Sequence, residues 1–258
     1  MESNTKIVSW NVNSIKARLD HVKRYLEEEK PDVLMIQELK GLEFPSSALE
    51  ENEHYTHAVC QKAYNGVAII ARTPITVIHD HLPGDDSDEQ ARYIEADING
   101  IRLINIYLPN GNPVTEPKYE YKLAWMERLY KRLKELTSSE TPFIIGGDFN
   151  VIPENKDCYS PKDWEGDAAF RPETHKIYRK ILNLGLTDAF RVFDTRAKQY
   201  SFWDYQAGAW QRGNGIRIDH FLLSPLYADL LQGCTINKTP RGWEKPSDHT
   251  PIEIIIGK

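Results

Sequence analysis

Residues 142–150 have the sequence PFIIGGDFN, a short apolar run that ends in two glycines, an aspartate and an asparagine. The run has the length of a strand and contains no alternating polar residues, which is typical of a strand buried on both faces. Six further short runs, most of them nearly continuously apolar, are KIVSW at 6–10, DVLMI at 32–36, GVAIIA at 66–71, RLINIY at 102–107, IDHFLL at 218–223 and IEIII at 252–256. These runs predict a protein built around buried strands.

Amphipathic segments lie between the apolar runs. Apolar residues at helical spacing predict a helix from about residue 15 to 29, which Asn13 or Ser14 could cap and Pro31 would end. Similar spacing predicts helices at 123–136 and around 174–184, whereas 81–89, 109–117 and 155–170 have the composition of loops. Because no repeat or linker is visible, residues 1–258 are expected to form a single domain of mixed strands and helices.

Length and composition exclude several classes of protein. The chain has 258 residues, of which 40% are hydrophobic and 27% charged, as in an ordinary globular protein. The longest apolar stretches are of strand length, so no membrane span or membrane partner is expected. The start, MESNTKIVSW, lacks the features of a signal peptide. The three cysteines, Cys60, Cys158 and Cys234, are scattered and suggest neither zinc nor a disulfide framework. A cytoplasmic monomer is therefore expected, associated with the nucleoid if the source is bacterial.

The net charge of −6 argues at first against a nucleic-acid partner, because phosphate binding requires Lys and Arg. The acid excess is local, however, since residues 80–97 hold seven acids and one base. Residues 171–217 hold nine bases, four acids and eight aromatic residues. Basic residues interleaved with aromatic ones suit a nucleic-acid surface, and the alternative is that the aromatic residues belong to the core and the bases to a solvated rim.

Isolated polar residues stand at the ends of six predicted strands. They are Asn11 and Asn13 after the first run, Gln37, Glu38 and Lys40 after the second, Tyr107 and Asn110 after RLINIY, Asp148 and Asn150 after PFIIGG, Asp219 and His220 in IDHFLL, and Ser247, Asp248 and His249 before IEIII. A single Asp or Asn after a strand is usually a turn or a helix cap. Six such endings predict a shared site, because strand ends at one edge of a sandwich converge.

The residue types at these endings favour one chemistry. Carboxylates such as Glu38, Asp148 and Asp248 are hard oxygen ligands of the kind that Mg²⁺ prefers. An aspartate beside a histidine can fix the imidazole tautomer and stabilise its protonated form. Asn, Tyr and His side chains can donate hydrogen bonds to a phosphoryl oxygen. Together they predict metal-assisted attack of water on a phosphodiester.

The motifs at these endings resemble one protein family. SWNVNSI, IQELK, YNGVAII, IYLPNG, GGDFN, YSFWDY, GIRIDH and EKPSDHTPI occur in the order found in the exonuclease III-type apurinic/apyrimidinic (AP) endonucleases, and the resemblance extends from Lys6 to Ile256. GDFN and SDH mark the wider endonuclease/exonuclease/phosphatase superfamily, whereas QELK, YSFWDY and RIDH point to the exonuclease III branch. The resemblance implies an α/β four-layer sandwich, with two packed mixed β-sheets flanked by helices.

The resemblance also implies roles for individual residues. The metal ligands, for Mg²⁺ with Mn²⁺ as a possible substitute, would come from Asn11, Glu38, Asp148, Asn150, Asp248 and His249. The catalytic residues would be Tyr107, Asp148, Asn150, Asp219 and His249. The substrate would contact Asn65, Gly66, Arg92 and Asn110, and an apolar pocket for a base-free sugar would be lined by Phe202, Trp203 and Ile216. Asn13, Gln206 and Asn214 depart from residues found in some relatives, so their roles are open.

The implied function is a Mg²⁺-dependent DNA repair nuclease. It would hydrolyse the phosphodiester 5′ to abasic sites in double-stranded DNA, and would also act on blocked 3′ ends as a 3′-phosphodiesterase and 3′→5′ exodeoxyribonuclease. One alternative keeps the fold and changes the substrate to a phosphoester that is not DNA. Another is a DNA-binding module without catalysis, although Glu38, Asp148, Asp219, Asp248 and His249 are all present.

Overall fold

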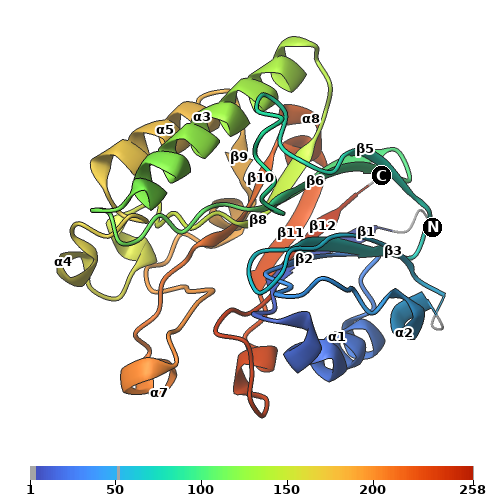
Figure 1. Cartoon of the computed structure of the whole chain (residues 1–258), viewed down its shortest axis with the longest axis horizontal. Helices are drawn as coiled ribbons and strands as arrows, with labels where there is room; N and C mark the ends of the chain where they lie inside the picture. The colour runs from blue at the N-terminus through green and yellow to red at the C-terminus, as the bar shows by residue number, and fades with distance from the viewer. Residues whose placement is uncertain (1–3, 51–52, 258) are drawn as a thin grey trace.

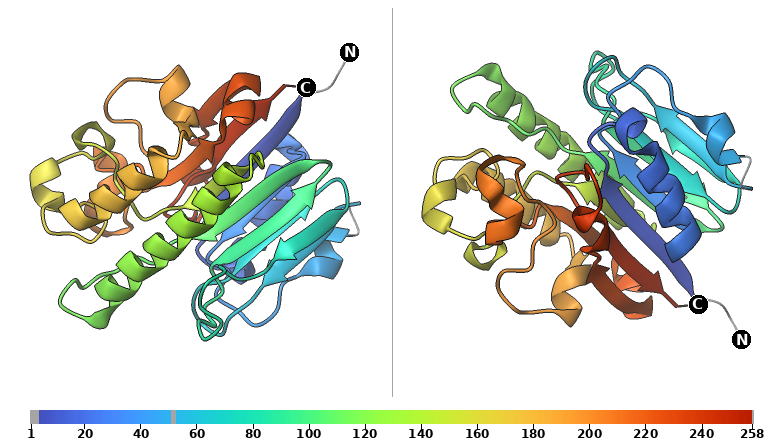
Figure 2. Two further views of the ribbon diagram at one scale, coloured as in Figure 1. Left: turned by 90° about the horizontal axis from the view of Figure 1, so that it is seen from above. Right: turned by 90° about the horizontal axis from the view of Figure 1, so that it is seen from below.

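The computed structural model describes residues 4–50 and 53–257. Two six-stranded sheets pack face to face, and helices cover both outer faces (Figure 1). Figure 2 shows α1 across the outer face of one sheet and α3 across that of the other. The structure is therefore the four-layer α/β sandwich that the resemblance to the exonuclease III-type enzymes implies.

The first sheet has the strand order β11-β12-β1-β2-β4-β3. Its central strands β1 and β2 are parallel, and its other neighbouring strands are antiparallel. The strands are β1 Thr5–Asn11, β2 Val33–Gln37, β3 Tyr55–Val59, β4 Val67–Ala71, β11 Leu231–Ile236 and β12 Ile252–Ile256.

The second sheet has the order β5-β6-β7-β8-β10-β9. Here β7 and β8 form the parallel pair at the centre. The strands are β5 Ile75–His79, β6 Tyr93–Ile98, β7 Ile101–Tyr107, β8 Ile144–Asp148, β9 Thr187–Asp188 and β10 Asp219–Leu223. All seven predicted runs are strands, whereas the sequence analysis did not identify β3, β5, β6, β9 and β11.

The three predicted helices are present. Helix α1 spans Ile15–Glu29; the side chain of Ser14 caps its start and Lys30 takes a left-handed conformation before Pro31. Helices α3 (Pro117–Ser138) and α5 (Pro172–Leu182) pack against each other over the second sheet (Figure 1). The shorter helices are α2 Ser46–Glu50, α4 Pro161–Trp164, α6 Ala189–Phe193, α7 Ala209–Arg212 and α8 Pro225–Leu230, with 3₁₀ turns η1 Asn155–Asp157, η2 Gln206–Gly208 and η3 Thr239–Gly242. The expected loop at 155–170 therefore contains η1 and α4.

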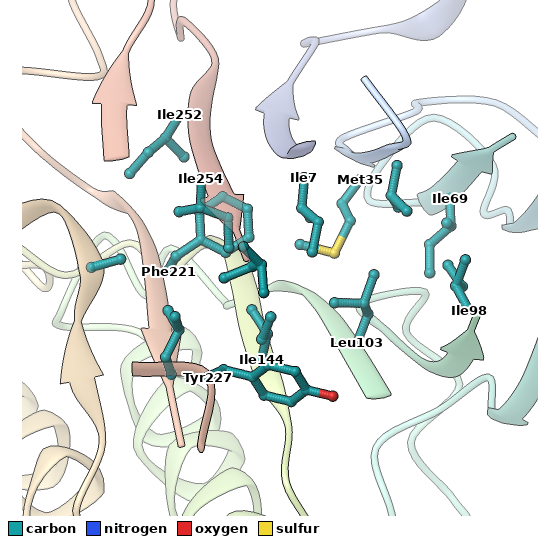
Figure 3. Packing of buried hydrophobic residues seen from close by; sticks show 14 of the residues in the cluster. Ile7, Met35, Ile69, Ile98, Leu103, Ile144, Phe221, Tyr227, Ile252 and Ile254 are labelled. Carbon is teal, nitrogen blue, oxygen red and sulfur yellow. The ribbon is translucent and has the colours of Figure 1, made fainter. Parts of the chain in front are cut away.

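The core lies mainly between the two sheets. Ile7, Met35 and Ile69 of the first sheet face Leu103, Ile144 and Phe221 of the second (Figure 3). Separate apolar layers lie between each sheet and its helices. These continuous apolar strands are buried on both faces, as the absence of alternation predicts.

Two buried amides interrupt this core between the sheets. Gln37 at the end of β2 donates to the side chains of Ser9 (3.0 Å) and Asn105 (2.8 Å). Asn105 in β7 donates to the backbone carbonyls of Ile36 (3.1 Å) and Ala68 (2.9 Å). Since a buried amide left without partners is costly, these bonds fix how the second sheet sits on the first.

Candidate active site

The strand pairing brings the polar strand ends together. The parallel pair β1–β2 ends with Asn11 opposite Gln37, and the parallel pair β7–β8 ends with Tyr107 opposite Asp148. Asp219 begins β10 opposite Asp148, because β10 runs antiparallel to β8. The expected convergence of strand ends is thus confirmed, and the site combines residues from both sheets.

Asn11 links the two sheets at this edge. Its side-chain amide donates to a carboxylate oxygen of Glu38 (2.8 Å) and to one of Asp148 (2.9 Å). Glu38 follows β2 in the first sheet, and Asp148 ends β8 in the second. One amide therefore holds two carboxylates near each other, where they could share a cation.

A buried acid–base chain adjoins this pair. Nδ1 of His249 lies 2.8 Å from Asp219, and its Nε2 lies 3.6 Å from Asp148. Burial raises the pKa of Asp148 to about 7, against the opposing effect of His249. Burial would lower the pKa of His249, but Asp219 and Asp148 outweigh it and raise that pKa to about 10. The imidazole is therefore held as a cation between two aspartates, and Asp148 can exchange a proton near neutral pH.

Hydrogen-bond donors surround Asp148. The side-chain amide of Asn150 donates to the carbonyl of Leu108 (2.8 Å), while the backbone N–H of Asn150 donates to Asp148 (2.9 Å). The amide of Asn110 lies 3.5 Å from the side-chain oxygen of Asn150. Burial and the nearby carboxylates raise the pKa of Tyr107 well above its ordinary value. Its phenol therefore stays protonated and can donate a hydrogen bond to an anion.

Arg92 supports Tyr107 in this arrangement. The guanidinium donates to the Tyr107 carbonyl (3.0 Å) and lies 5.0 Å from the centre of the Tyr107 ring. A second bond joins Arg92 to Gln90 (2.8 Å). Arg92 thus holds the tyrosine from beside it in this structure, a contact that the sequence did not predict.

Asn65 and Gly66 shape the turn that carries Glu38. The Asn65 carbonyl accepts from the backbone N–H of Lys40 (3.0 Å), and the Gly66 carbonyl accepts from that of Leu39 (3.2 Å). Glu38 and Lys40 both have positive φ, at 64° and 56°. At Gly66, with φ of +94°, a Cβ atom would lie 2.7 Å from Leu39 Cβ. These two residues therefore hold a strained turn against the site, and such strain is common at functional positions.

Asp248 lies at the edge of the site, and Asn13 connects it to Lys40. The amide of Asn13 donates to Asp248 (3.2 Å), and its oxygen accepts from the Lys40 ammonium. Lys40 also forms an ion pair with Glu38 (2.9 Å). Asn13 is thus part of a polar bridge between Glu38 and Asp248, which gives this residue a position that the sequence left open.

A small cavity lies beside His249. The rings of Phe202 and His249 are 4.9 Å apart, and Phe202 pairs with Ile216 across an isolated bridge. The cavity measures about 220 Å³, and its lining is Tyr159, Trp164, Phe202, Asp204, Gln206, Ala207, Ala209, Asn214 and Ile216. The expected pocket residues Phe202 and Ile216 are therefore present, and Gln206 and Asn214, whose roles were open, line the same cavity.

The expectation that Trp203 lines this pocket is wrong. Trp203 is only 2% exposed and packs against Tyr200 and Trp210. Adjacent residues in an extended segment point to opposite sides, so Phe202 faces the cavity and Trp203 faces away. The sequence analysis also missed Tyr159 and Trp164, which come from the 155–170 segment that it treated as a loop. Their aromatic character was the available signal.

The donor set fits a hard divalent cation. Asp148, Asp219 and His249 each offer an atom such that all three lie within 4.8 Å of one another, and Asn11 holds Glu38 beside them. Oδ1 of Asp219 is buried and accepts no hydrogen bond within the described part of the chain. Carboxylate oxygens are the ligands that Mg²⁺ prefers, and an orphaned buried oxygen is consistent with a cation nearby.

Comparison with known proteins identifies the family. Residues 8–249 match the pattern of the Endonuclease/Exonuclease/phosphatase family. Exodeoxyribonuclease III of Haemophilus influenzae is 31% identical over 261 residues, which cover 96% of this chain and 98% of the relative. The chain belongs to the exonuclease III family of AP endonucleases. The expected resemblance and fold are thereby confirmed.

Solved structures of similar proteins agree with this exonuclease III-type architecture. An AP endonuclease from Archaeoglobus fulgidus superimposes with a TM-score of 0.93 at 37% identity, covering 98% of this chain and 99% of that one. A Neisseria 3′ phosphatase, NExo, bound to a product DNA hairpin gives a TM-score of 0.95 at 35% identity, covering 98% of this chain and 100% of that one. This chain is therefore a phosphodiester hydrolase of the exonuclease III/AP endonuclease type, a family of DNA nucleases.

Two further observations concern the partners of this exonuclease III-family chain. No helix in the described ranges is long and apolar enough to cross a membrane.

Within the acidic 80–97 stretch, Asp88 pairs with Arg128 (2.7 Å), and Glu95 pairs with Arg132 (2.8 Å) and Arg102 (3.1 Å). Part of the acid excess is thus neutralised inside the fold.

Proposed function

We propose that this chain is a Mg²⁺-dependent AP endonuclease that hydrolyses the phosphodiester 5′ to an abasic site and leaves a 3′-hydroxyl. The observation that carries the proposal is the small Phe202–Ile216 cavity, because the Phe202 ring that lines it also packs against the imidazole of His249 in the Asp148–His249–Asp219 chain. Blocked or recessed 3′ ends of double-stranded DNA are proposed as further substrates. Residues 1–258 are proposed to act as one catalytic domain in a monomer.

The site residues divide the chemistry among them. Asp148, buried and 3.6 Å from the His249 imidazole, can take a proton from the attacking water. His249, held protonated by Asp219, can stabilise the charge that develops on the phosphoryl oxygens. Asn150 and Tyr107 can donate hydrogen bonds to the same phosphate. Each role is suited to the burial and charge of its residue.

The metal is proposed to be held by Glu38 and Asp148, with Asn11, Asn150 and Asp248 around them; His249 was also expected as a ligand, but a protonated imidazole has no lone pair for a metal and is assigned to the phosphate instead. When bound, Mg²⁺ supplies Lewis-acid polarisation of the scissile phosphate. Asn11 orients both main carboxylates through its two hydrogen bonds (2.8 and 2.9 Å). Removal of the cation should therefore abolish hydrolysis while leaving the fold intact.

The cavity supports selection of an abasic nucleotide by size. Its volume of about 220 Å³ lies below the range of roughly 300–1,000 Å³ that is usual for drug-sized ligands. A base-free sugar is smaller than a complete nucleotide, and an abasic nucleotide has no base to unstack when it flips out of the duplex. Phe202 and Ile216 would contact the apolar face of this sugar.

A second candidate is 3′-phosphatase activity on DNA ends. It is favoured by the likeness to the Neisseria 3′ phosphatase NExo, which was solved bound to a product DNA hairpin. The two candidates share one phosphate site and differ in the use of the cavity.

The test compares three labelled duplexes in parallel: one with a single abasic site, one with a 3′-phosphate at a nick, and one with a recessed 3′ end. Each is incubated with Mg²⁺, with Mn²⁺ or with EDTA. We expect metal-dependent incision on the 5′ side of the abasic site, with a 3′-hydroxyl product. Removal of the 3′-phosphate without abasic incision would establish the second candidate instead. Lack of cleavage of every duplex at all Mg²⁺ and Mn²⁺ concentrations would refute both.

Matched variants test the assigned residues. Asp148→Asn and His249→Ala should each lower the single-turnover rate by at least ~10²-fold, because each removes a proton-transfer or charge-stabilising group. Asp229→Asn makes the same change at an exposed position on α8 and should leave the rate unchanged. Near-normal rates in the first two variants would contradict the assignment.

A further inference from the structure

Lys122 is a buried lysine in an unexpected place. It is 0% exposed and lies on the buried face of α3, between Tyr119 and Met126 at helical spacing. A lysine in such an apolar stripe is rare unless it is paired with a carboxylate. Lys122 forms no ion pair with any residue between 4 and 50 or between 53 and 257. Its ammonium donates instead to two backbone carbonyls, those of Asn110 (3.1 Å) and Asn150 (2.6 Å).

These two carbonyls belong to the loops that follow β7 and β8. Each loop carries an asparagine assigned to the candidate active site, and the two side chains meet, since the Asn110 amide lies 3.5 Å from the Asn150 side-chain oxygen. Asn150 has a φ of 46°, a left-handed conformation that needs support from its surroundings. The ammonium therefore joins the two loops through the backbone carbonyls of the same two asparagines.

The packing around the lysine stem is equally specific. At Gly111, with φ of +85°, a Cβ atom would lie 2.6 Å from Lys122 Cδ and 3.1 Å from Ala168 Cβ. Only glycine leaves room for the stem to reach both carbonyls. The NG pair at 110–111 is thus explained by the lysine as well as by the turn.

We propose that Lys122 is a positioning residue for phosphodiester hydrolysis, which couples the Asn110 and Asn150 loops into one rigid unit. The inference rests on the proposed function, because it assigns Asn110 and Asn150 to the scissile phosphate. The lysine acts through its two hydrogen bonds to the backbone carbonyls of Asn110 and Asn150. A group held before the reaction begins need not be ordered during it, so loss of this unit should lower the rate of the chemical step.

The experiment is a double-mutant cycle on the single-turnover cleavage rate at saturating enzyme. This rate does not depend on the fraction of enzyme molecules that are active. Lys122→Met keeps the length of the stem and removes the ammonium, and Asn110→Ala removes one side chain that the lysine positions. Each should lower the rate by at least ~10-fold, and the double variant should be at most about 3-fold slower than the slower single variant. Lys131→Met makes the same charge change on the exposed face of α3 and should stay within about 2-fold of the wild type.

The outcomes separate this inference from the proposed function. If the wild type cleaves none of the duplexes, the proposed function fails. If the wild type is active and the two losses multiply independently, or if Lys122→Met is as fast as Lys131→Met, the positioning role is overturned. Should Lys122→Met not fold, Gly111→Ala takes its place in the cycle, since its methyl group displaces the stem while keeping the charge. The same coupling with Asn110→Ala is then expected, and independence would again overturn the proposal.

Discussion

Gly147 in β8 has no room for a side chain, which predicts a severe effect of Gly147→Ala. With φ of +146° at this position, a Cβ atom would lie 2.0 Å from the carbonyl oxygen of Ile106 in the neighbouring strand β7. Since real Cβ contacts are essentially never shorter than 3.0 Å, the two strands would have to separate by about 1 Å. Gly147 pairs with Ile106 one step before Tyr107 pairs with Asp148, so the displacement would reach the site.

The cost can be worked from two contributions. Overpacking a closed site costs typically about 1–3 kcal/mol, and a positive φ for an L-residue adds about 1–2 kcal/mol. The expected loss in the free energy of unfolding is therefore about 2–5 kcal/mol. In a chain of this size each kcal/mol corresponds to about 2–4 °C in melting temperature, so Tm should fall by on the order of 10 °C.

Gly100→Ala is the matched control. Gly100 also has a positive φ, of +80°, but a Cβ atom there would meet nothing within 4 Å. Thermal melts followed by circular dichroism should therefore place Gly147→Ala about 5 °C below Gly100→Ala, the difference being the steric contribution. Cleavage by Gly147→Ala below its melting temperature should also be slowed. Equal melting temperatures for the two variants, within about 2 °C, would refute the argument from close approach.

Three further predictions concern stability and binding. Arg217→Met should lower the free energy of unfolding in urea by about 3–5 kcal/mol, because it leaves the partners of the buried guanidinium, Asp157 (2.7 Å) and Asp188 (2.9 Å), under-compensated; the exposed Arg196→Met should unfold like the wild type. Burial lowers the pKa of His220 to about 4, so the unfolded chain binds this proton more tightly. The free energy of unfolding should therefore fall by about 3 kcal/mol between pH ~6.5 and pH ~4. His220→Gln should flatten that part of the curve of unfolding free energy against pH, and identical curves for the variant and the wild type would contradict the prediction. Finally, the affinity for abasic duplex should fall with salt at a modest slope, and a slope implying about ten or more neutralised phosphates would be inconsistent with a few contacts near the cleft.

The sequence predicted strands where burial is complete and failed where it is not. β3, β5, β9 and β11 are the four edge strands of the two sheets, and their residues are mostly half-buried or exposed. Edge strands need no continuous apolar run, so their composition does not distinguish them from loops. β6 was missed for another reason, since it contains the buried Glu95, whose charge is matched by Arg102 and Arg132 from elsewhere in the chain. Such a partner is invisible to a local pattern.

The candidate site could be predicted from the sequence only as far as the order of the strands could be predicted. Polar residues at strand ends converge because parallel strands end at one edge, and this holds for Asn11, Tyr107 and Asp148. The cavity was less predictable, because Trp164 reaches it from an inserted helix whose position depends on long-range packing. Lys122 carried a usable signal, a lysine within the apolar stripe of α3.

The Gln37–Asn105 hydrogen bond fixes the alignment of one sheet on the other. Glu38 follows a strand of one sheet and Asp148 ends a strand of the other. The Asn11 amide, which donates to both carboxylates, lies next to this hydrogen bond, because Asn11 pairs with Gln37. A sheet that slid by one residue along its partner would keep its own strand pairing and much of its apolar burial, yet it would separate the carboxylates. Catalytic activity should therefore depend on correct packing of the two sheets against each other. A partly folded chain with loosely packed sheets would therefore hold all the catalytic residues and still be inactive.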